Sequence, residues 1–290
     1  MEIISTRELS KYLKINEKKI YKLVQESKIP HIKIGGKIAF TKEIIDRWIL
    51  ENTAREQHIY IAGSDDVLLR RIIDIYNSKN TGIAFYAPIG SINGLKMLQN
   101  NSATISCVHI LDIEKKEYNL SYLDRYLGKD DYVVIHLFLR EQGIYLQKNN
   151  PKEIHSLEDI ATKGVTFINR NQGSGTRLLL DFLLSEKHMD ASAINGYNAE
   201  VESHLHAGLN VLKGEADSAF GIQHIAYILG LDFIPLFNER FDMVISKAHF
   251  YSNQVKTFLT FFEQPALVNH IRDFTGYDTT KTGNIISTDV

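Results

Sequence analysis

Three turns in this sequence place a hydroxyl side chain directly after a glycine, where a strand-like run gives way to a helix-like run. They are Gly63-Ser64, Gly90-Ser91 and the longer Gly173-Ser174-Gly175-Thr176. At the start of a helix, unpaired backbone N–H groups and the positive end of the helix dipole attract anions, and glycine permits close approach of a ligand. Serine after glycine is also an ordinary helix cap. The occurrence of three such turns together therefore favours a site for an anion.

The runs around these turns alternate between strand and helix from residue 58 onward. Strands are predicted at "HIYIAGS", "GIAFYAPIGS", "ATISCVHIL" and "GVTFI", and helices at "DDVLLRRIIDIYN", "INGLKMLQN" and "RLLLDFLL". Farther along, "DFIPLF" and "FDMVIS" are predicted as two separate extended segments. This alternation predicts an α/β fold with parallel sheets covered on both faces. The carboxyl ends of parallel strands share one edge of a sheet, so we expect the three turns to face one cleft.

Two phosphate-binding motifs that glycine-rich turns commonly form are absent from the sequence. The P-loop requires a lysine before its final Ser or Thr, whereas here Thr176 is followed by Arg177. The dinucleotide fingerprint requires a third glycine where this chain has Leu178. A nucleotide ligand is therefore not expected. Two roles remain open for Arg177, which could contact the ligand or form a helical ion pair with Asp181 one turn later.

The sequence shows no pattern for metal binding or covalent catalysis. The single cysteine, Cys107, excludes an intrachain disulfide and a cysteine-cluster metal site, and its apolar surroundings predict an inert buried thiol. His204 and His206 are two residues apart, so they diverge on a helix, and no H-E-x-x-H motif occurs. They are expected as surface or core histidines rather than as ligands, although His204 remains a candidate contact. We expect no catalytic residue, no metal site and no covalently bound cofactor.

The composition is that of a folded globular protein, with 44% apolar and 23% charged residues in a chain of 290. No apolar run approaches the ~18 residues that a membrane-spanning helix needs, and the start lacks a secretory segment, so a cytoplasmic location without membrane contact is expected. The net charge of −2 divides unevenly, because residues 1–57 contain twelve Lys or Arg and eight Asp or Glu, and the rest contain 21 and 27. A small basic module therefore precedes a larger acidic one.

The basic module has the pattern of two short helices separated by a tight turn. Ser5 and Glu8 have the spacing of a capping box, and Tyr12 is predicted on the apolar face of the first helix together with its leucine neighbours. Asn16 is expected to cap a second helix over "EKKIYKLVQESK", whose lysines face away from its apolar residues. This arrangement is typical of a helix-turn-helix.

Further landmarks follow the second helix. The alternating runs of "IPHIKIGGKIAF" flank Gly35-Gly36 and predict a hairpin, and "TKEIIDRWILENT" predicts a third helix with Trp48 facing inward. The stretch from "TRELSKYL" to "IIDRWI", about 45 residues with every landmark in order, resembles the excisionase-type, MerR-like winged helix-turn-helix.

The resemblance implies that the second helix enters the major groove of DNA and that the hairpin, or wing, approaches the backbone or the minor groove. Lysines on that helix would contact phosphates, whereas Tyr21, Lys22 and Gln25 are the candidates for base edges. The candidate DNA-contacting residues are Lys18, Lys19, Tyr21, Lys22, Gln25 and, in the wing, Lys37. The net charge of this module, +4, is modest, so useful affinity for DNA is expected from a homodimer or higher homo-oligomer on repeated half-sites.

The larger module resembles the periplasmic-binding-protein-like domain of cytoplasmic molybdate- and tungstate-responsive regulators. The resemblance rests on "GVTFINRNQGSGTRLLLDFLL", on the stretch from "GYNAEVESHLHAGLNVLKG" to "RFDMVIS", and on the closing "FTGYDTTKTGNI". It implies a two-lobed type II fold over residues 58–290, with lobe 1 at about 58–138 and 240–290 and lobe 2 at about 139–239. The DNA-binding domain is then expected at residues 1–55.

This resemblance implies an anion held between the lobes, which would favour their closed arrangement. The candidate ligand contacts are Ser64, Ser91, Ser174, Gly175, Thr176, Arg177, Ser203 and His204, with Glu202 beside them. The expected ligand is tungstate or molybdate, two anions that the sequence does not distinguish. Asp65 and Asp66 would compete with a bound dianion, which leaves molybdopterin or its metal complex as the alternative ligand.

Together these observations favour a one-component transcription regulator, in which the winged helix binds operator DNA and the two-lobed domain senses the oxyanion. A second hypothesis is an enzyme of molybdenum-cofactor metabolism that carries a DNA-binding module. The sequence shows no activated nucleophile and no paired catalytic carboxylates, which argues against it. A third hypothesis, an architectural excision factor, leaves the larger domain without a role. The sign of the ligand's effect on DNA binding is not predicted.

Overall fold

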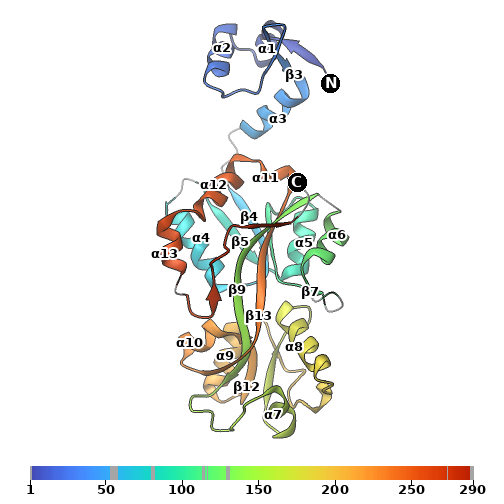
Figure 1. Ribbon diagram of the computed structural model, residues 1–290, viewed down its shortest axis with the longest axis vertical. Helices are drawn as coiled ribbons and strands as arrows, with labels where there is room; N and C mark the ends of the chain where they lie inside the picture. Colours follow the sequence, from blue (N-terminus) through green and yellow to red (C-terminus); the bar gives the residue numbers. More distant parts are fainter. Residues whose placement is uncertain are drawn as a thin grey trace. The chain divides into compact units, whose positions relative to one another are not determined.

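The computed structural model describes residues 2–52, 58–79, 82–112, 115, 117–128, 131–272 and 274–287. The chain divides into two compact units, Met1–Gln57 and His58–Val290, whose helices and strands are shown in Figure 1. Residue 55, the predicted end of the DNA-binding domain, lies outside the described residues. Within the described residues, no helix is both long and apolar enough to span a membrane.

The N-terminal unit consists of two short helices, a hairpin and a third helix, as predicted (Figure 1). Its elements are β1 (Ile3–Ser5), α1 (Thr6–Leu13), α2 (Glu17–Gln25), β2 (Ile32–Ile34), β3 (Lys37–Thr41) and α3 (Lys42–Asn52). The strands form an antiparallel sheet in the order β1-β3-β2. Gly35 and Gly36 both have positive φ angles, 57° and 78°, which explains why glycines occupy the turn of the hairpin.

Helix caps and an apolar core hold this short unit together. Ser5 accepts a hydrogen bond from the N–H of Glu8 at 3.3 Å, and the Glu8 carboxylate accepts one from the N–H of Ser5 at 2.8 Å, so the predicted capping box is confirmed. Asn16 caps α2 by accepting from the N–H of Lys19 at 2.8 Å. The buried core side chains are Ile4, Leu9, Ile20, Val24, Ile29, Phe40 and Ile45.

The prediction that Tyr12 faces the core is wrong. Its side chain is 47% exposed, and its hydroxyl donates a hydrogen bond to the Asp46 carboxylate on α3 at 2.5 Å. A phenol ring is apolar but its hydroxyl needs a polar partner, which the surface carboxylate provides. Trp48 does pack against the core, and its indole N–H donates to the carbonyl oxygen of Lys28 at 2.9 Å.

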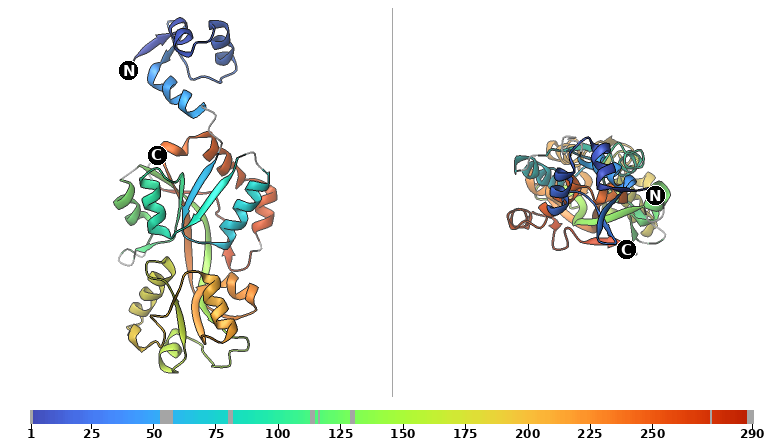
Figure 2. Two further views of the ribbon diagram at one scale, coloured as in Figure 1. Left: turned by 180° about the vertical axis from the view of Figure 1, so that it is seen from behind. Right: turned by 90° about the horizontal axis from the view of Figure 1, so that it is seen from above.

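The second unit has two lobes (Figures 1 and 2). The elements of the first lobe are β4 (Ile59–Gly63), α4 (Val67–Lys79), β5 (Ala84–Pro88), α5 (Ser91–Gln99), β6 (Ile105–Val108), β7 (Leu111–Asp112), β8 (Glu117–Tyr118), α6 (Leu120–Leu127), α11 (Lys247–Phe250), α12 (Asn253–Phe261) and α13 (Pro265–Ile271). The elements of the second lobe are α7 (Leu157–Thr162), β10 (Phe167–Arg170), α8 (Gly175–Glu186), the 3-10 helix η1 (Ala191–Ala193), β11 (Glu200–Val201), α9 (His204–Lys213), β12 (Ser218–Ile222) and α10 (Gln223–Leu229).

Two long strands, β9 (Tyr132–Leu146) and β13 (Asp232–Ser246), run through both lobes (Figure 1). They pair with each other, and near the end of the chain β14 (Tyr277–Asp278) and β15 (Ile285–Ser287) also pair with β9. The main order of the sheet is β11-β10-β12-β9-β13-β6-β4-β5. Strands β9 and β13 connect the two lobes, and we call the segment where they pass from one lobe to the other the hinge.

The prediction of parallel sheets is correct only away from the hinge strands. The pairs β4-β5, β4-β6, β10-β11 and β10-β12 are parallel, but β9 and β13 run antiparallel to each other and to their outer neighbours. "DFIPLF" and "FDMVIS", predicted as separate segments, form the single strand β13. The polar residues between them, 238–240, interrupt the apolar pattern although they are fully extended.

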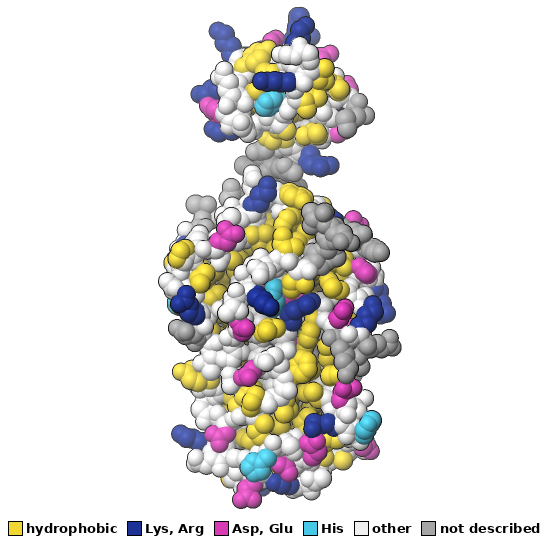
Figure 3. Space-filling view, in the orientation of Figure 1, with side chains coloured by type: hydrophobic (Ala, Val, Ile, Leu, Met, Phe, Trp, Pro, Cys, Tyr) yellow, Lys and Arg dark blue, Asp and Glu magenta, His cyan; other side chains and the backbone are white. Residues whose placement is uncertain are grey.

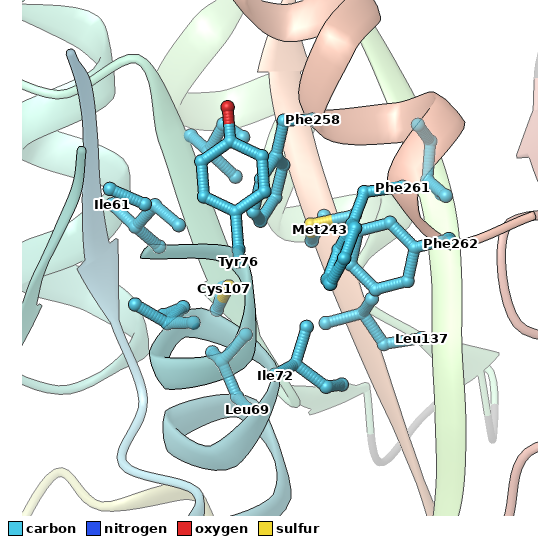
Figure 4. Close-up of a cluster of buried hydrophobic side chains, with 14 of the residues drawn as sticks. Ile61, Leu69, Ile72, Tyr76, Cys107, Leu137, Met243, Phe258, Phe261 and Phe262 are labelled. Carbon is cyan, nitrogen blue, oxygen red and sulfur yellow. The ribbon is translucent and has the colours of Figure 1, made fainter. Parts of the chain in front are cut away.

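Helices cover both faces of the sheet in each lobe. In the first lobe, α4, α12 and α13 pack on one face and α5 and α6 on the other, and in the second lobe α7 and α8 lie opposite α9 and α10. Figure 4 shows one of these clusters, in which Tyr76 meets the ring edges of Phe258 and Phe261 at centroid distances of 5.0 and 5.4 Å. Cys107 lies in this cluster, and burial raises the pKa of its thiol, as expected of an inert side chain.

Candidate ligand-binding cleft and DNA-binding helix

A cavity of about 800 Å³ lies between the two lobes of the second unit. Its walls include the turns that precede four helices, α4 and α5 of the first lobe and α8 and α9 of the second. Helix starts of this kind carry unpaired N–H donors and the positive end of a dipole, so four of them around one space suit an anion. The predicted contacts in the lining are Ser64, Ser174, Gly175, Thr176, Ser203 and His204, with Glu202 beside them.

The wall of the first lobe contains a pair of serine hydroxyl groups. Ser64 and Ser91 are each 2% exposed, and a hydrogen bond of 2.5 Å joins their hydroxyl oxygens. Ser91 Oγ also accepts from the N–H of His109 at 3.3 Å. Ser64 lines the cavity, whereas Ser91 is not among the described residues that line it. Ser91 therefore holds Ser64 in place from behind.

The two aspartates at the start of α4 are each paired with a cation. Asp65 accepts a hydrogen bond of 2.9 Å from Nε of Arg70 in α4, and Nη2 of the same arginine forms an ion pair with it at 2.9 Å. Asp66 caps α4 by accepting from the N–H of Leu69 at 2.9 Å, and its other oxygen accepts from Arg140 at 2.7 Å. Because these negative charges are compensated within the first lobe and the hinge, they leave the cavity open to an anion.

The wall of the second lobe is built by two capped helices. Ser174 Oγ accepts from the N–H of Arg177 at the start of α8 at 3.2 Å, and Ser203 Oγ accepts from the N–H of His206 at the start of α9 at 3.1 Å. Each oxygen acts as an acceptor in its cap, so each hydroxyl proton remains available to a ligand.

Arg177 belongs to an ion-pair cluster outside the cavity lining. It pairs with Asp181 at 3.2 Å and with Glu200 at 3.3 Å, and its guanidinium lies 3.9 Å from the centroid of the Tyr197 ring. Of the two interpretations that the sequence leaves open, the structure favours the helical ion pair. Arg177 thus stabilises the first turn of α8 from the side away from the cleft.

Arg170 is the buried cation of the cleft, and the sequence reasoning missed it. It ends β10, is 6% exposed, and donates from one amino group to the carbonyl oxygen of Glu202 at 2.8 Å. Its Nε is buried and has no hydrogen-bond partner within the described part of the chain. Burial lowers the pKa of Arg170 to about 10, so the guanidinium stays charged at neutral pH. A buried charged donor without a partner is costly, which makes this atom a candidate contact for an anion.

His204, the first residue of α9, is a second buried polar group at the cavity. It is 5% exposed, and its Nδ1 has no partner among the described residues. Burial and the nearby charges of Arg170 and Arg140 lower the pKa of His204 well below its ordinary value, so the ring is neutral at pH 7. One ring nitrogen can therefore donate a hydrogen bond to a ligand.

The lobes touch where His109 of the first lobe packs against Gly175 of the second. A Cβ at position 175 would lie 2.3 Å from Cε1 and 2.5 Å from Nδ1 of the His109 ring, and 2.8 Å from the His109 carbonyl oxygen. The His109 ring is held by a hydrogen bond of 2.5 Å to Glu239 and stacks on Phe241. The second glycine of the Gly-Ser-Gly-Thr turn therefore allows this contact between the lobes.

A buried ion network on the hinge strands connects to both cavity walls. Arg140 of β9 and Glu239 of β13 are register partners, and Arg140 Nε donates to Glu239 Oε2 at 2.7 Å. The same carboxylate accepts from Gln142 and His109, and Arg140 donates to Asp66. Burial alone would raise the pKa of Glu239, but His109, Arg140 and the hydrogen bonds lower it to about 2. The network is therefore charged at neutral pH, and within the described residues it leaves Nη2 of Arg140 and Oε1 of Gln142 buried without a hydrogen-bond partner.

The residues that sequence reasoning missed carry different signals. Arg170 lies inside "NRNQGSGTR", at the last strand position before the turn, so its place in the motif was a usable signal. His109, Arg140 and Glu239 meet only through the pairing of β6, β9 and β13, which no local pattern reveals.

The exposed face of α2 carries the predicted DNA-contacting residues. Its exposed side chains at helical spacing i, i+3, i+4 and i+7 are Lys18, Tyr21, Lys22 and Gln25. Ile20 and Val24 on the opposite face are buried, and Lys19 and Lys37 are exposed as well. Figure 3 shows Lys and Arg side chains standing out from the surface of the N-terminal unit. This face is therefore free to meet a phosphate backbone.

The fold and the two sites define a binding-protein domain of type II joined to an excisionase-type helix-turn-helix. Residues 74–263 match the PBP superfamily domain, and residues 3–53 match the helix-turn-helix domain. The chain belongs to the PBP superfamily. Both parts are of classes that bind other molecules.

Two relatives have similar sequences. The chain is 29% identical over 302 residues to protein YvgK of Bacillus subtilis (strain 168), covering 96% of each chain. It is 31% identical over 111 residues to a protein from the 5′ region of a ferredoxin 2Fe-2S gene in Clostridium pasteurianum, covering 38% of this chain and 98% of that one.

Solved structures of similar fold include three proteins with named oxyanions. The tungstate ABC transporter from Geobacter sulfurreducens is 16% identical, with 76% of this chain and 99% of that chain covered and a TM-score of 0.55. The tungstate-binding protein TupA from Desulfovibrio alaskensis G20 is 17% identical, with 75% and 94% covered and a TM-score of 0.54. An ABC-type phosphate transport receptor from Vibrio cholerae is 15% identical, with 77% and 99% covered and a TM-score of 0.52. At these identities the likeness shows the fold.

Proposed function

We propose that this protein is a one-component DNA-binding regulator whose second unit binds a tetrahedral oxyanion, tungstate or molybdate, between its lobes. The observation that carries the proposal is that Arg170, whose buried Nε has no hydrogen-bond partner among the described residues, lines a cavity walled by four helix starts. The guanidinium supplies positive charge and the helix starts supply N–H donors. Hydroxyl groups of Ser64 and Ser174 add donors from opposite lobes, so an anion between them would favour the closed arrangement.

Oxyanions as the ligand class are also supported by the similar folds. Two of the proteins named above are a tungstate-binding protein and a tungstate transporter, and the third is a phosphate receptor. Tungstate and molybdate carry two negative charges without a proton at neutral pH, which suits a cavity rich in donors. Neither unit belongs to a class defined by catalysis, so we propose a binding role and no enzymatic one.

The output of the protein is proposed to be transcription control. In this proposal Lys18, Lys19 and Lys37 contact phosphates, and Tyr21, Lys22 and Gln25 reach base edges. A single helix-turn-helix unit of modest charge binds weakly, so a homodimer on repeated half-sites is proposed. DNA binding also supports a cytoplasmic location. Closure of the lobes would change the spacing or orientation of the two DNA-binding units.

A second candidate ligand is favoured by the size of the cavity. Its volume of about 800 Å³ is far larger than a tetrahedral oxyanion. An oxyanion carried on a larger organic group, as in molybdopterin, could place its phosphate at the Gly-Ser-Gly-Thr turn and its ring system in the remaining space. The two candidates share the oxyanion contacts and differ in the outer part of the cleft.

The test of this proposal is calorimetric titration of the metal-free protein with tungstate, molybdate, sulfate and phosphate in turn. We expect one-to-one binding of tungstate or molybdate and little heat from sulfate. Absence of binding by all four anions would contradict the oxyanion proposal, and a subsequent titration with molybdopterin would decide the second candidate. A gel shift on the protein's own upstream region, with and without the bound anion, tests the regulatory part.

Removal of the exposed lysines of α2 should weaken DNA binding in a salt-dependent way. Each lysine that no longer neutralises a phosphate reduces the slope of log K against log salt by about 0.9, so the variant Lys18→Ala with Lys22→Ala should lower the slope by about two. Affinity at low salt should fall by about tenfold or more. Fluorescence anisotropy with a labelled upstream duplex at several salt concentrations gives both quantities.

The matched control for this variant is Lys148→Ala, which removes an exposed lysine from the second unit. It should leave slope and affinity unchanged. An unchanged slope in the double variant would show that the face of α2 is solvated without contacting DNA.

A further inference from the structure

Gln142 occupies a place between the ion network and the ligand turn of the second lobe. Its side chain is fully buried on β9, with Nε2 2.5 Å from Glu239 Oε2 and 3.3 Å from Thr176 Oγ1. A carboxylate oxygen only accepts hydrogen bonds, so the amide atom that faces Glu239 must be the nitrogen. An amide nitrogen has two protons, and the second is then directed to Thr176. Gln142 therefore makes the Thr176 oxygen an acceptor.

The Thr176 hydroxyl has one proton of its own to donate. In a helix interior such a proton commonly bonds to a carbonyl of the preceding turn, but Thr176 is the second residue of α8 and that turn has not yet formed. Thr176 lines the cavity beside Ser174 and Gly175. With its oxygen already engaged by Gln142 on the inner side, the hydroxyl proton is left to point toward the cavity.

We propose that Gln142 is a positioning residue of the anion site, which acts through Thr176 by directing the threonine hydroxyl proton into the cleft. This inference rests on the proposed oxyanion function. The amide is fixed because Glu239 is itself held by Arg140 at 2.7 Å and by His109 at 2.5 Å. Gln142 lies on a strand that runs through both lobes, so the same contact ties the hinge to the Gly-Ser-Gly-Thr turn.

A double-mutant cycle on ligand affinity tests this inference. Gln142→Met keeps the length of the side chain and removes both hydrogen bonds, and Thr176→Val keeps the shape and removes the hydroxyl. Each single variant should weaken tungstate or molybdate binding by about tenfold, the size of one hydrogen bond to a charged group. If Gln142 acts through Thr176, the double variant should be no weaker than Thr176→Val alone. Isothermal titration of the full-length chain provides all four affinities.

A merely structural role of Gln142 would give a different pattern. It would lower the midpoint of thermal unfolding of the free protein, and its effect on affinity would be small or would multiply with that of Thr176→Val to about a hundredfold. A small effect of Gln142→Met on affinity, or a hundredfold loss in the double variant, would overturn the inference. Thr176→Ser, which retains the hydroxyl, should keep the wild-type affinity within about twofold, and a loss as large as that of valine would also contradict it.

The cycle separates this inference from the proposed function. Wild-type protein that binds none of the tested anions would remove both, whereas normal binding by the wild type and by Gln142→Met would remove the positioning role alone. If the methionine variant does not fold, Gln142→Leu tests the same link with a smaller apolar side chain, and the same outcomes apply.

Discussion

Replacement of Arg170 by methionine should lower the affinity for tungstate or molybdate by about 100-fold or more. Loss of one partner from a buried, hydrogen-bonded charge pair costs about 2–5 kcal/mol, and 2.7 kcal/mol already corresponds to a factor of about 100. Arg170 is 6% exposed and its Nε has no protein partner within the described residues, so the anion would be its main compensation. The free protein should lose little stability, because the variant removes the unpaired buried Nε together with one hydrogen bond to the carbonyl oxygen of Glu202. Calorimetric titration and thermal unfolding without ligand measure the two effects.

The matched control for Arg170 is Arg177→Met, seven residues later on the adjoining helix. Arg177 is also buried, but its charge is used by Asp181 and Glu200. This variant should lower the midpoint of unfolding and change the affinity for the anion by less than about threefold. The reverse pattern, with affinity reduced at Arg177 and retained at Arg170, would move the anion to the other side of α8. Arg170→Lys should recover little affinity, because an ammonium group lacks the planar donors of the guanidinium.

The local elements of this chain could be predicted because their signals are local. The capping box of Ser5 and Glu8, the cap at Asn16 and the hairpin at Gly35-Gly36 each depend on residues within a few positions of one another. In such motifs the spacing of the residues is enough to predict the local backbone geometry. The prediction for Tyr12 was wrong for the opposite reason, because the orientation of its side chain depends on Asp46 in another helix.

The ion network on the hinge strands could not be predicted because it depends on the register of two strands that are far apart in sequence. Arg140 and Glu239 are 99 positions apart and become partners only when β9 and β13 pair along their length. In sequence, charged residues in the middle of an apolar pattern indicate a break in a strand. Here they mark the part of the strand that is buried between lobes, where charges compensate one another.

The sequence predicted the turns that line the cleft, but it did not predict the buried positive charge of Arg170. Glycine and serine at a strand-to-helix turn are visible in the sequence, and the turns at Ser64, Gly90 and Ser174 do line one cavity. Arg170 lies inside the motif "NRNQGSGTR", but an arginine at the end of a strand can equally lie on a surface, so its position alone did not identify it as a ligand contact. Its role follows only from burial and from the missing partner of Nε.

Replacement of Gly175 by alanine should abolish tight anion binding by keeping the lobes apart. The added Cβ would lie 2.3 and 2.5 Å from ring atoms of His109 and 2.8 Å from its carbonyl oxygen, all of which belong to the first lobe. Gly175 is the first residue of α8 and has no positive φ, so alanine fits its own backbone. The clash is therefore relieved most easily by opening the hinge. We expect an affinity loss of about 100-fold, because the anion then meets the donors of one lobe at a time.

A distance measurement distinguishes opening of the lobes in Gly175→Ala from local damage to the Gly-Ser-Gly-Thr turn. The distance between spin labels at Lys96→Cys on α5 and Lys187→Cys after α8 reports on the lobes, and the buried Cys107 should stay unlabelled. In Gly175→Ala this distance should lengthen and respond little to anion, whereas in the wild type it should shorten on binding. Adding His109→Ala removes the two closest ring contacts and should restore part of the affinity, although Glu239 loses a hydrogen-bond partner. An unchanged distance together with reduced affinity would show that alanine acts on the Gly-Ser-Gly-Thr turn itself, and the contact between His109 and Gly175 would then have no part in closure.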